Sequence, residues 1–123
     1  MEFTQQTANE FSTAWINAWN AHDIEAVLKH YTEDFEIITP LAEKILGAGN
    51  KSVQGKENVR IYWQKGLQLI PGLHFKLLEV FVGIESLAIY YQNTATHTKA
   101  VENLFFNTDG YVYKSVVMYS SEN

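Results

Sequence analysis

Hydrophobic positions in the first part of the chain recur at helical spacing. Side chains three and four positions apart share one face of a helix, and the face in question is apolar and aromatic. Its members are Ala8, Phe11, Ala14, Trp15, Ala18 and Trp19. This stripe predicts an amphipathic helix that ends at residues 20–22.

A second, shorter helical stripe follows and leads into a strand. Asp23 can cap the amides two and three residues further on, and the stripe consists of Ile24, Val27, Leu28 and Tyr31. Residues 35–40 then alternate as a strand does, with one face formed by Phe35, Ile37 and Thr39. Pro40 closes this strand.

Residues 41–55 contain three glycines and few bulky side chains, which predicts a loop. The loop is either a mobile cover over a pocket mouth or a plain connector. A third helix is predicted from Lys56 to the turn at Pro71 and Gly72. Its apolar face consists of Val59, Tyr62, Trp63, Leu67 and Ile70.

The remaining sequence has strand character. Four segments, 73–82, 87–96, 100–107 and 111–119, are separated by short turns, of which 108–110 is a hairpin turn with Gly110 available for positive φ. Connections this short favour antiparallel pairing. The order of elements predicts an α+β fold in which three helices from the N-terminal half pack on the concave side of a curved antiparallel sheet. We expect a ligand cavity where that sheet opens.

Composition narrows the class of protein further. A chain of 123 residues suits a single domain, 1–123, and a net charge of −5 without a basic cluster argues against nucleic acid as a partner. The chain has no cysteine, and its N-terminus is polar, so we expect a cytoplasmic protein that does not engage a membrane.

The segments AWNAHDIEAVLKHYTEDFEI, VQGKENVRIYWQKGL and VENLFFNTDGYVYKSVVMY, in this order, resemble the NTF2-like superfamily and in particular its SnoaL-like branch. The resemblance covers nearly the whole chain. It implies a cone-shaped α+β fold with an internal cavity and a homodimer formed through the sheet. It does not imply one activity, because this fold hosts isomerases, cyclases, dehydratases and non-catalytic domains.

Ketosteroid isomerase is the catalytic member whose roles can be compared position by position. The resemblance places Thr39 where that enzyme has its general base and Trp15 where it has a tyrosine that donates to the oxyanion. Tyr31 keeps a supporting tyrosine, Trp63 replaces another, and Glu102 matches the protonated acid. A threonine hydroxyl is not a proton-abstracting base near neutral pH, so we do not expect steroid isomerase activity.

Glu102 is the most informative ionisable residue. It shares a strand face with Leu104 and Phe106. If that face lines the cavity, desolvation should raise the pKa of the Glu102 carboxyl group. The alternative is that Val101 and Phe105 define the buried face and Glu102 is exposed. His97, in the preceding turn, is the second candidate for acid/base chemistry.

The histidines lack metal-ligand spacing, and no dinucleotide or phosphate-binding motif is present, so we expect neither a metal nor a cofactor. The candidate ligand-binding residues are mostly aromatic and lie on the inward faces of consecutive elements. They are Trp15, Trp19, Tyr31, Phe35, Thr39, Trp63, Asn93, Leu104, Val117 and Tyr119.

Two functional classes remain open from the sequence. The first is a small enzyme that performs cofactor-independent acid/base chemistry, of isomerase, cyclase or dehydratase type, on a small and largely apolar molecule. Glu102 would act as acid or base, with Trp15 or Tyr31 as a hydrogen-bond donor. The second is a non-catalytic module that binds a ligand or dimerises.

Overall fold

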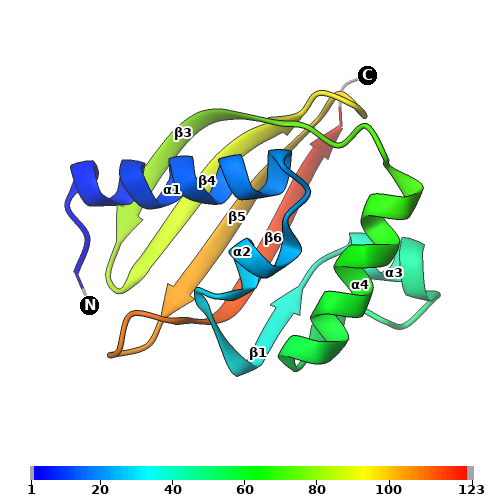
Figure 1. Cartoon of the computed structure of the whole chain (residues 1–123), viewed down its shortest axis with the longest axis horizontal. Coiled ribbons are helices and arrows are strands. Elements are labelled where there is room, and N and C mark those ends of the chain that lie inside the picture. Colours follow the sequence, from blue (N-terminus) through cyan, green and yellow to red (C-terminus); the bar gives the residue numbers. More distant parts are fainter. Residues whose placement is uncertain (1, 122–123) are drawn as a thin grey trace.

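The computed structural model describes residues 2–121, which form a six-stranded sheet with helices on one face (Figure 1). The helices are α1 (Gln5–Asn20), α2 (Ile24–Leu28), α3 (Leu41–Leu46) and α4 (Lys56–Leu69). The strands are β1 (Tyr31–Ile38), β2 (Ser52–Gln54), β3 (Phe75–Gly83), β4 (Ser86–Asn93), β5 (Thr98–Phe106) and β6 (Val112–Ser121). None of the helices in this range is long and apolar enough to cross a membrane.

Side-chain caps begin the first two helices, and the cap of the second, Asp23, is the one that the sequence predicts. Thr4 accepts from the amide of Thr7 at 3.1 Å, and the Thr7 hydroxyl accepts from the amide of Thr4 at 3.0 Å. Asp23 accepts from the amide of Ala26 at 3.1 Å. These bonds satisfy amides that have no partner inside the helix, so the predicted break between the two helices is confirmed.

The second helix is shorter than its apolar stripe indicated. It ends at Leu28, and Tyr31 opens β1 instead of closing the helix. Tyr31 pairs with Val112 of β6, whose amide donates to the carbonyl of His30 at 2.8 Å. Because both a helix and a strand would bury this side chain, periodicity alone could not distinguish them.

The prediction of a loop for residues 41–55 is wrong in two places. Residues 41–46 form α3, and residues 52–54 form β2, which pairs with β1. Gly66 of α4 faces α3, since a Cβ at that position would lie 3.7 Å from Cδ1 of Ile45, an ordinary van der Waals distance. Helix α3 thus contacts α4, and local helix propensity alone does not reveal such a contact.

The strand order is β2-β1-β6-β5-β4-β3, with antiparallel pairing from β6 to β3, as predicted. Strand β1 is parallel to β6, which the short connections between the later strands did not indicate. The hairpin between β5 and β6 has Gly110 at φ 86°, as its turn requires. The three predicted helices and the curved sheet are thus present, with α3 in addition.

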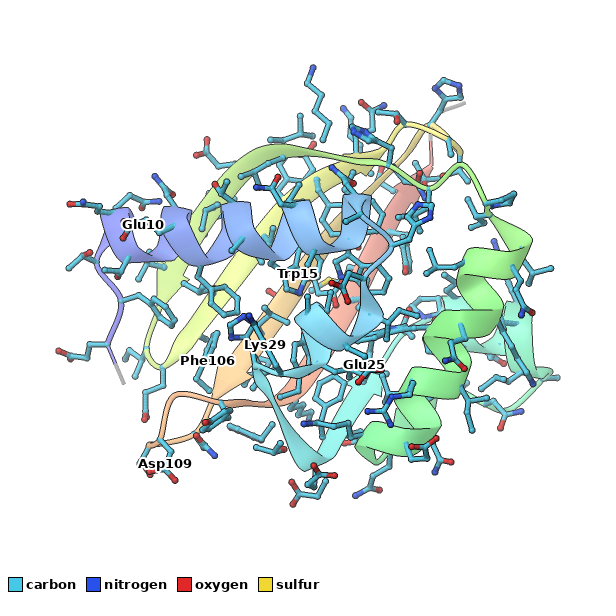
Figure 2. All side chains as sticks on the ribbon, viewed as in Figure 1. Glu10, Trp15, Glu25, Lys29, Phe106 and Asp109 are labelled. Atoms are coloured by element: carbon cyan, nitrogen blue, oxygen red, sulfur yellow. The ribbon has the colours of Figure 1, made fainter. Side chains whose placement is uncertain are left out.

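The core fills the space between the helices and the inner sheet face. Trp15 projects from α1 toward the sheet (Figure 2), and its ring centroid lies 5.6 Å from that of Tyr91 and 6.1 Å from that of Phe75. The ring centroids of Trp19 and of Trp63 in α4 are 4.8 Å apart. Aromatic contacts of this kind contribute beyond the area they bury, and they join α1, α4 and the sheet around one end of the core.

Candidate functional site

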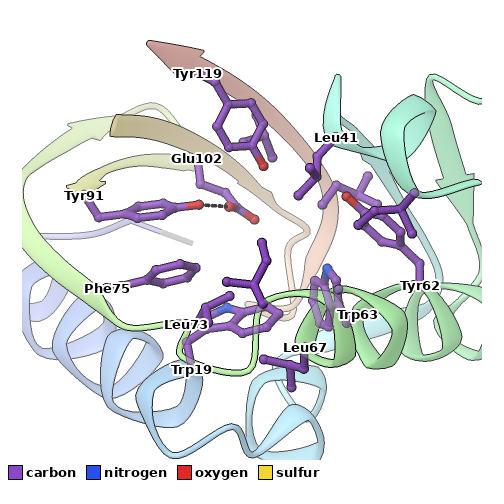
Figure 3. A pocket seen from close by; sticks show the side chains of 15 residues that line it. Trp19, Leu41, Tyr62, Trp63, Leu67, Leu73, Phe75, Tyr91, Glu102 and Tyr119 are labelled. Atoms are coloured by element: carbon purple, nitrogen blue, oxygen red, sulfur yellow. Dashed lines mark hydrogen bonds between the residues drawn. The ribbon is translucent and has the colours of Figure 1, made fainter. Parts of the chain in front are cut away.

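A cavity of about 60 Å³ lies between α4, α3, the end of α1 and the inner face of the sheet. Its wall is largely apolar, and most of its polar atoms belong to one carboxyl group and a few aromatic side chains. Figure 3 shows the carboxyl group of Glu102 and the phenol oxygen of Tyr119 directed into this space, with Tyr62 and Trp63 across from the sheet. We call it the inner cavity.

Glu102 lines the inner cavity from β5 and is only 5% exposed. The face that Glu102 shares with Leu104 and Phe106 is therefore the buried one, and the alternative in which Glu102 is exposed is wrong. Its Oε1 accepts from the phenol of Tyr91 at 3.0 Å, and its Oε2 accepts from the hydroxyl of Ser115 at 3.2 Å. Both neighbouring strands thus hold the carboxyl group in place.

Burial raises the pKa of Glu102 to about 7, even though the hydrogen bonds from Tyr91 and Ser115 lower it. Desolvation penalises the charged form, and the two donors only partly replace the water that would otherwise solvate it. A carboxyl group with this pKa is present as acid and as base in comparable amounts at neutral pH. That is the condition under which a group transfers protons efficiently in both directions.

Tyr62 and Tyr119 also lie on the wall of the inner cavity, and neither is hydrogen-bonded to Glu102. Burial raises the pKa of Tyr119 to about 12 and also raises that of Tyr62. Both phenols therefore stay protonated and can donate hydrogen bonds. The hydroxyl of Thr39 contacts the Tyr119 oxygen at 3.4 Å, which links the end of β1 to this wall without placing Thr39 in the lining.

Trp19 adds a further donor to the inner cavity wall. Its indole Nε1 is buried, and within residues 2–121 it has no hydrogen-bond partner. A buried donor without an acceptor is costly. A polar atom of a bound molecule or a water could satisfy it.

A second cavity of about 350 Å³ adjoins the first toward the end of the sheet where β4 turns into β5. We call it the outer cavity. The two share Leu41, Ile70, Leu73, Phe75, Tyr91 and Tyr119. The inner cavity alone is less than half of the roughly 150 Å³ that holds a benzene molecule in a protein interior. The outer cavity is within the range of ligand pockets, roughly 300–1,000 Å³.

The structure distributes the ligand-binding candidates over three places. Trp19, Trp63 and Val117 line the inner cavity, Asn93 lines the outer cavity, and Tyr119 lines both. The remaining candidates are buried outside the two linings, namely Trp15, Tyr31, Phe35, Thr39 and Leu104.

Trp15 and Tyr31 are joined to each other rather than directed at the cavity. The indole Nε1 of Trp15 donates to the phenol oxygen of Tyr31 at 2.9 Å, and both side chains are buried. This bond satisfies the only donor of the indole. The two residues predicted as donors to a ligand therefore form a structural pair in the core.

His97 does not accompany Glu102. It lies in the exposed turn between β4 and β5 with φ 59° and outside both cavity linings. Five residues along an extended strand span about 16 Å, which separates the two side chains. Glu102 is thus the acid/base candidate that the geometry brings to a cavity.

Sequence reasoning missed three polar residues of the site: Tyr62, Tyr91 and Ser115. Tyr91 shares the inward face of β4 with Leu87 and Ile89, and this period of two is visible in the sequence. Its contact with Glu102 depends on the β4–β5 register, in which Ala100 faces Tyr91 and Ile89 faces Glu102. Register is a tertiary property, so the contact itself could not be read from the sequence.

No group of three or more histidine, aspartate or glutamate side chains within the described part of the chain is placed to hold a metal ion. The polar groups of the two cavities are instead phenols, indoles, hydroxyls, one amide, one carboxyl group and the ammonium group of Lys44. This set suits hydrogen bonding and proton transfer with an organic molecule.

These features define the class of protein: a curved sheet with helices on its concave face and a buried carboxyl group in the cavity, which is the NTF2-like fold. The family model of the SnoaL-like domain matches residues 12–122, and the chain belongs to that family. No match was found among curated proteins.

Solved structures support the same assignment. A SnoaL-like protein of unknown function from Burkholderia thailandensis E264 is 39% identical, with a TM-score of 0.91 over 98% of this chain and 100% of that chain. TerC, crystallised with polyporic acid, is 15% identical, with a TM-score of 0.74 over 92% of this chain and 91% of that chain.

A third similar structure is a protein with a ketosteroid isomerase-like fold from Catenulispora acidiphila DSM 44928, in complex with trimethylamine. It is 15% identical, with a TM-score of 0.68 over 90% of this chain and 85% of that chain. The last two similarities concern the fold alone.

Proposed function

We propose that this protein is an enzyme that moves a proton on a small, largely apolar organic molecule, with Glu102 as the acid and base and no cofactor. The observation that carries the proposal is a carboxyl group with a pKa of about 7 at the wall of an otherwise apolar cavity. Functional sites are where such perturbed groups concentrate.

The chemistry that fits is proton transfer at a carbon next to a carbonyl group. The Glu102 carboxylate removes the proton, the electron pair of the broken C–H bond forms a C=C bond, and negative charge moves to the carbonyl oxygen. The resulting carboxylic acid returns the proton to another atom of the same molecule. Isomerisation, cyclisation and dehydration all include such a step.

The developing negative charge on the oxygen needs hydrogen-bond donors that are already in place. Tyr62 and Tyr119 are protonated phenols on the cavity wall, and both are candidates for this role. They replace Trp15 and Tyr31, which are bonded to each other in the core.

The sizes of the two cavities indicate how a ligand would be placed. The inner cavity has room for a reacting group of a few atoms, and the outer cavity has room for the body of the molecule. A methyl ketone on a larger apolar body has this shape. TerC shares the fold and was crystallised with an organic ligand, polyporic acid, which is compatible with such use of the fold.

Deuterium exchange in heavy water tests the proposal without knowledge of the natural substrate. With benzylacetone as the probe, we expect the protein to accelerate exchange at the methyl group next to the carbonyl. Glu102→Gln should reduce the acceleration by about 100-fold or more, the usual contribution of a general base. Glu79→Gln, on an exposed position of β3, is the matched control and should retain it.

Absence of accelerated exchange across a panel of methyl ketones, with binding of the same ketones retained, would overturn the enzyme proposal. It would favour the alternative, a non-catalytic domain that binds such molecules. Because binding and exchange are measured on the same probes, the two functions are separated directly.

We also propose that the protein is a homodimer formed through the outer face of the sheet. Tyr90, Val101 and Met118 are neighbours across β4, β5 and β6, on the face opposite to Glu102. Met118 is 57% exposed. A row of apolar side chains on an exposed sheet face is typical of an interface between subunits.

A further inference from the structure

The polar part of the outer cavity wall carries several hydrogen-bond donors and one positive charge. Four polar side chains line it besides Tyr91 and Tyr119: Lys44, Asn93, Thr96 and Thr98. No aspartate or glutamate belongs to the lining. A wall that can donate and carries positive charge favours an anionic group over a neutral one.

Asn93 lines this cavity from β4. Its Oδ1 accepts from the amide of Ala95 at 3.0 Å, and this bond fixes which end of the side chain is oxygen and which is nitrogen. Within residues 2–121 the nitrogen has no hydrogen-bond partner, although the residue is only 9% exposed. The amide group is thus held in one orientation, and its nitrogen is available to donate to a ligand.

Thr98 lies directly opposite Asn93 in the β4–β5 pairing, so both side chains project from the same face. The hydroxyls of Thr96 and Thr98 are 2.7 Å apart, and one donates to the other. The hydroxyl that accepts keeps its own hydrogen. The threonine pair therefore offers at least one further donor beside the amide of Asn93.

Lys44 of α3 lines the outer cavity from the opposite side. It is exposed, and none of the carboxylates in the described range lies within ion-pair distance of it. The net charge of −5 would repel an anion at long range, but salt screens charges beyond about 8 Å. Lys44 is the one charged side chain among the residues that line the outer cavity, so a ligand bound there meets a positive charge at short range.

We propose that the outer cavity binds the carboxylate of an organic acid whose far end enters the inner cavity. Asn93, the threonine pair and Lys44 would hold the carboxylate. Only the part that concerns the reacting end of the acid rests on the proposed function. The carboxylate site is argued from residues of the outer cavity, which do not include Glu102.

The strand geometry sets the length of such an acid. Thr98, Ala100 and Glu102 follow one another on the inward face of β5. Four residues of extended strand span about 13 Å from Thr98 to Glu102. Since the side chains of Thr98 and Glu102 and the contacts they make take up part of this span, the carboxylate and the reacting carbon would be separated by an apolar chain of several carbon atoms or by a ring system, rather than by one or two bonds.

Matched probes test the proposal: 7-oxooctanoate, its neutral amide 7-oxooctanamide, and the short keto acid pyruvate. Their dissociation constants with the whole protein can be measured by calorimetry or by NMR titration. We expect the long acid to bind about tenfold more tightly than its amide, as a charge-assisted hydrogen bond would give. Pyruvate cannot span the two cavities and should bind more weakly than 7-oxooctanoate.

Two variants identify the groups responsible. Lys44→Gln should bring the ratio of acid to amide affinity close to one, whereas Lys65→Gln, which removes an equal charge from an exposed position of α4 outside the linings, should leave the ratio unchanged. Asn93→Asp keeps the acceptor for Ala95 and replaces the donor by a negative oxygen, so the acid should lose at least tenfold in affinity. Circular dichroism checks that both variants fold.

Equal affinity for the long acid and its amide would overturn the proposal, as would equal effects of Lys44→Gln and Lys65→Gln or a failure of 7-oxooctanoate to bind. The proposed function fails differently. If 7-oxooctanoate binds with the expected dependence on Lys44 but its methyl protons do not exchange, the carboxylate site is supported and the proton-transfer activity is not.

Discussion

The phenol of Tyr91 on β4 donates a hydrogen bond of 3.0 Å to Oε1 of Glu102 on β5, at the wall of the inner cavity. This contact joins two effects of opposite sign. Burial removes water from the carboxyl group and raises its pKa, and the bond stabilises the ionised form and lowers it. The balance leaves the pKa of the carboxyl group at about 7, at a position where the group can exchange protons with a ligand.

Glu102 should make the stability of the protein depend on pH. Its pKa is about 7 when folded and near 4.5 when exposed, so the folded state holds an extra proton between these values. Stability is then highest below pH 4.5 with respect to this group and falls as pH rises through 7. Above pH 8 the free energy of unfolding is lower by about 3 kcal/mol than below pH 4.5, as far as this group is concerned.

Glu102→Gln removes the titration, so its free energy of unfolding relative to the wild type should rise by about 3 kcal/mol between pH 4.5 and pH 8. Urea unfolding across this range measures it. Glu79→Gln, which changes an exposed carboxyl group of β3, is measured alongside as the control. A constant difference between Glu102→Gln and the wild type would contradict the assigned pKa.

Removal of either donor to Glu102 should raise the pKa of the carboxyl group further. Tyr91→Phe eliminates the bond to Oε1, and Ser115→Ala eliminates the bond to Oε2. We expect the larger increase for Tyr91→Phe, because its bond is the shorter of the two and lowers the pKa more. Carbon NMR titration of the carboxyl resonance measures both, and a fall in either variant would refute the mechanism.

The sequence was sufficient for the fold where one physical signal dominated. The helical stripe of α1 and the cap at Asp23 were found because period and capping agree there. The sequence does not predict the helix at residues 41–46. There α3 packs on α4 beside Gly66, a contact that local propensity does not encode. Tyr31 was assigned to a helix because burial is required in either conformation.

The same distinction holds for the site. Alternation along β5 placed Glu102 on the buried face, which the structure confirms. Alternation could not show that Trp15 would bond to Tyr31, since that contact joins α1 to β1. Nor could it show that Tyr91 would reach Glu102, because the register between β4 and β5 decides which side chains meet.

The Trp15–Tyr31 pair should matter for stability and not for ligand binding. Tyr31→Phe leaves the indole nitrogen of Trp15 buried without an acceptor, which costs about 1–3 kcal/mol. Denaturant unfolding measures this loss. Affinity for 7-oxooctanoate should stay within twofold of the wild type, because neither residue lines a cavity.

Tyr62→Phe is the matched change on the cavity wall. It should slow proton exchange in benzylacetone with a smaller effect on unfolding than Tyr31→Phe. If Tyr31→Phe slowed exchange as much as Tyr62→Phe at equal folded fraction, the division between core pair and cavity wall would be wrong.

Gly66→Ala should stabilise the protein. The position is helical, and the added methyl group would meet Cδ1 of Ile45 at 3.7 Å, an ordinary van der Waals distance. The gain in helix propensity is about 0.5–1 kcal/mol. Gly55→Ala is the contrasting variant, because φ is 92° there and a side chain introduces strain of about 1–2 kcal/mol. Thermal unfolding should shift upward for Gly66→Ala and downward for Gly55→Ala.

The proposed dimer interface predicts that a charge at Met118 separates the subunits. Met118 lies beside Val101 on the outer sheet face. Met118→Glu would therefore place a carboxylate in the apolar row, and this charge would have to be desolvated on association. Sedimentation at micromolar concentration should show a dimer for the wild type and a monomer for this variant. Ile84→Glu, at the 92% exposed tip of the β3–β4 hairpin, introduces the same charge away from the row and should remain dimeric. A monomeric wild type at these concentrations would refute the interface, and dissociation by Ile84→Glu but not by Met118→Glu would move it to the hairpin.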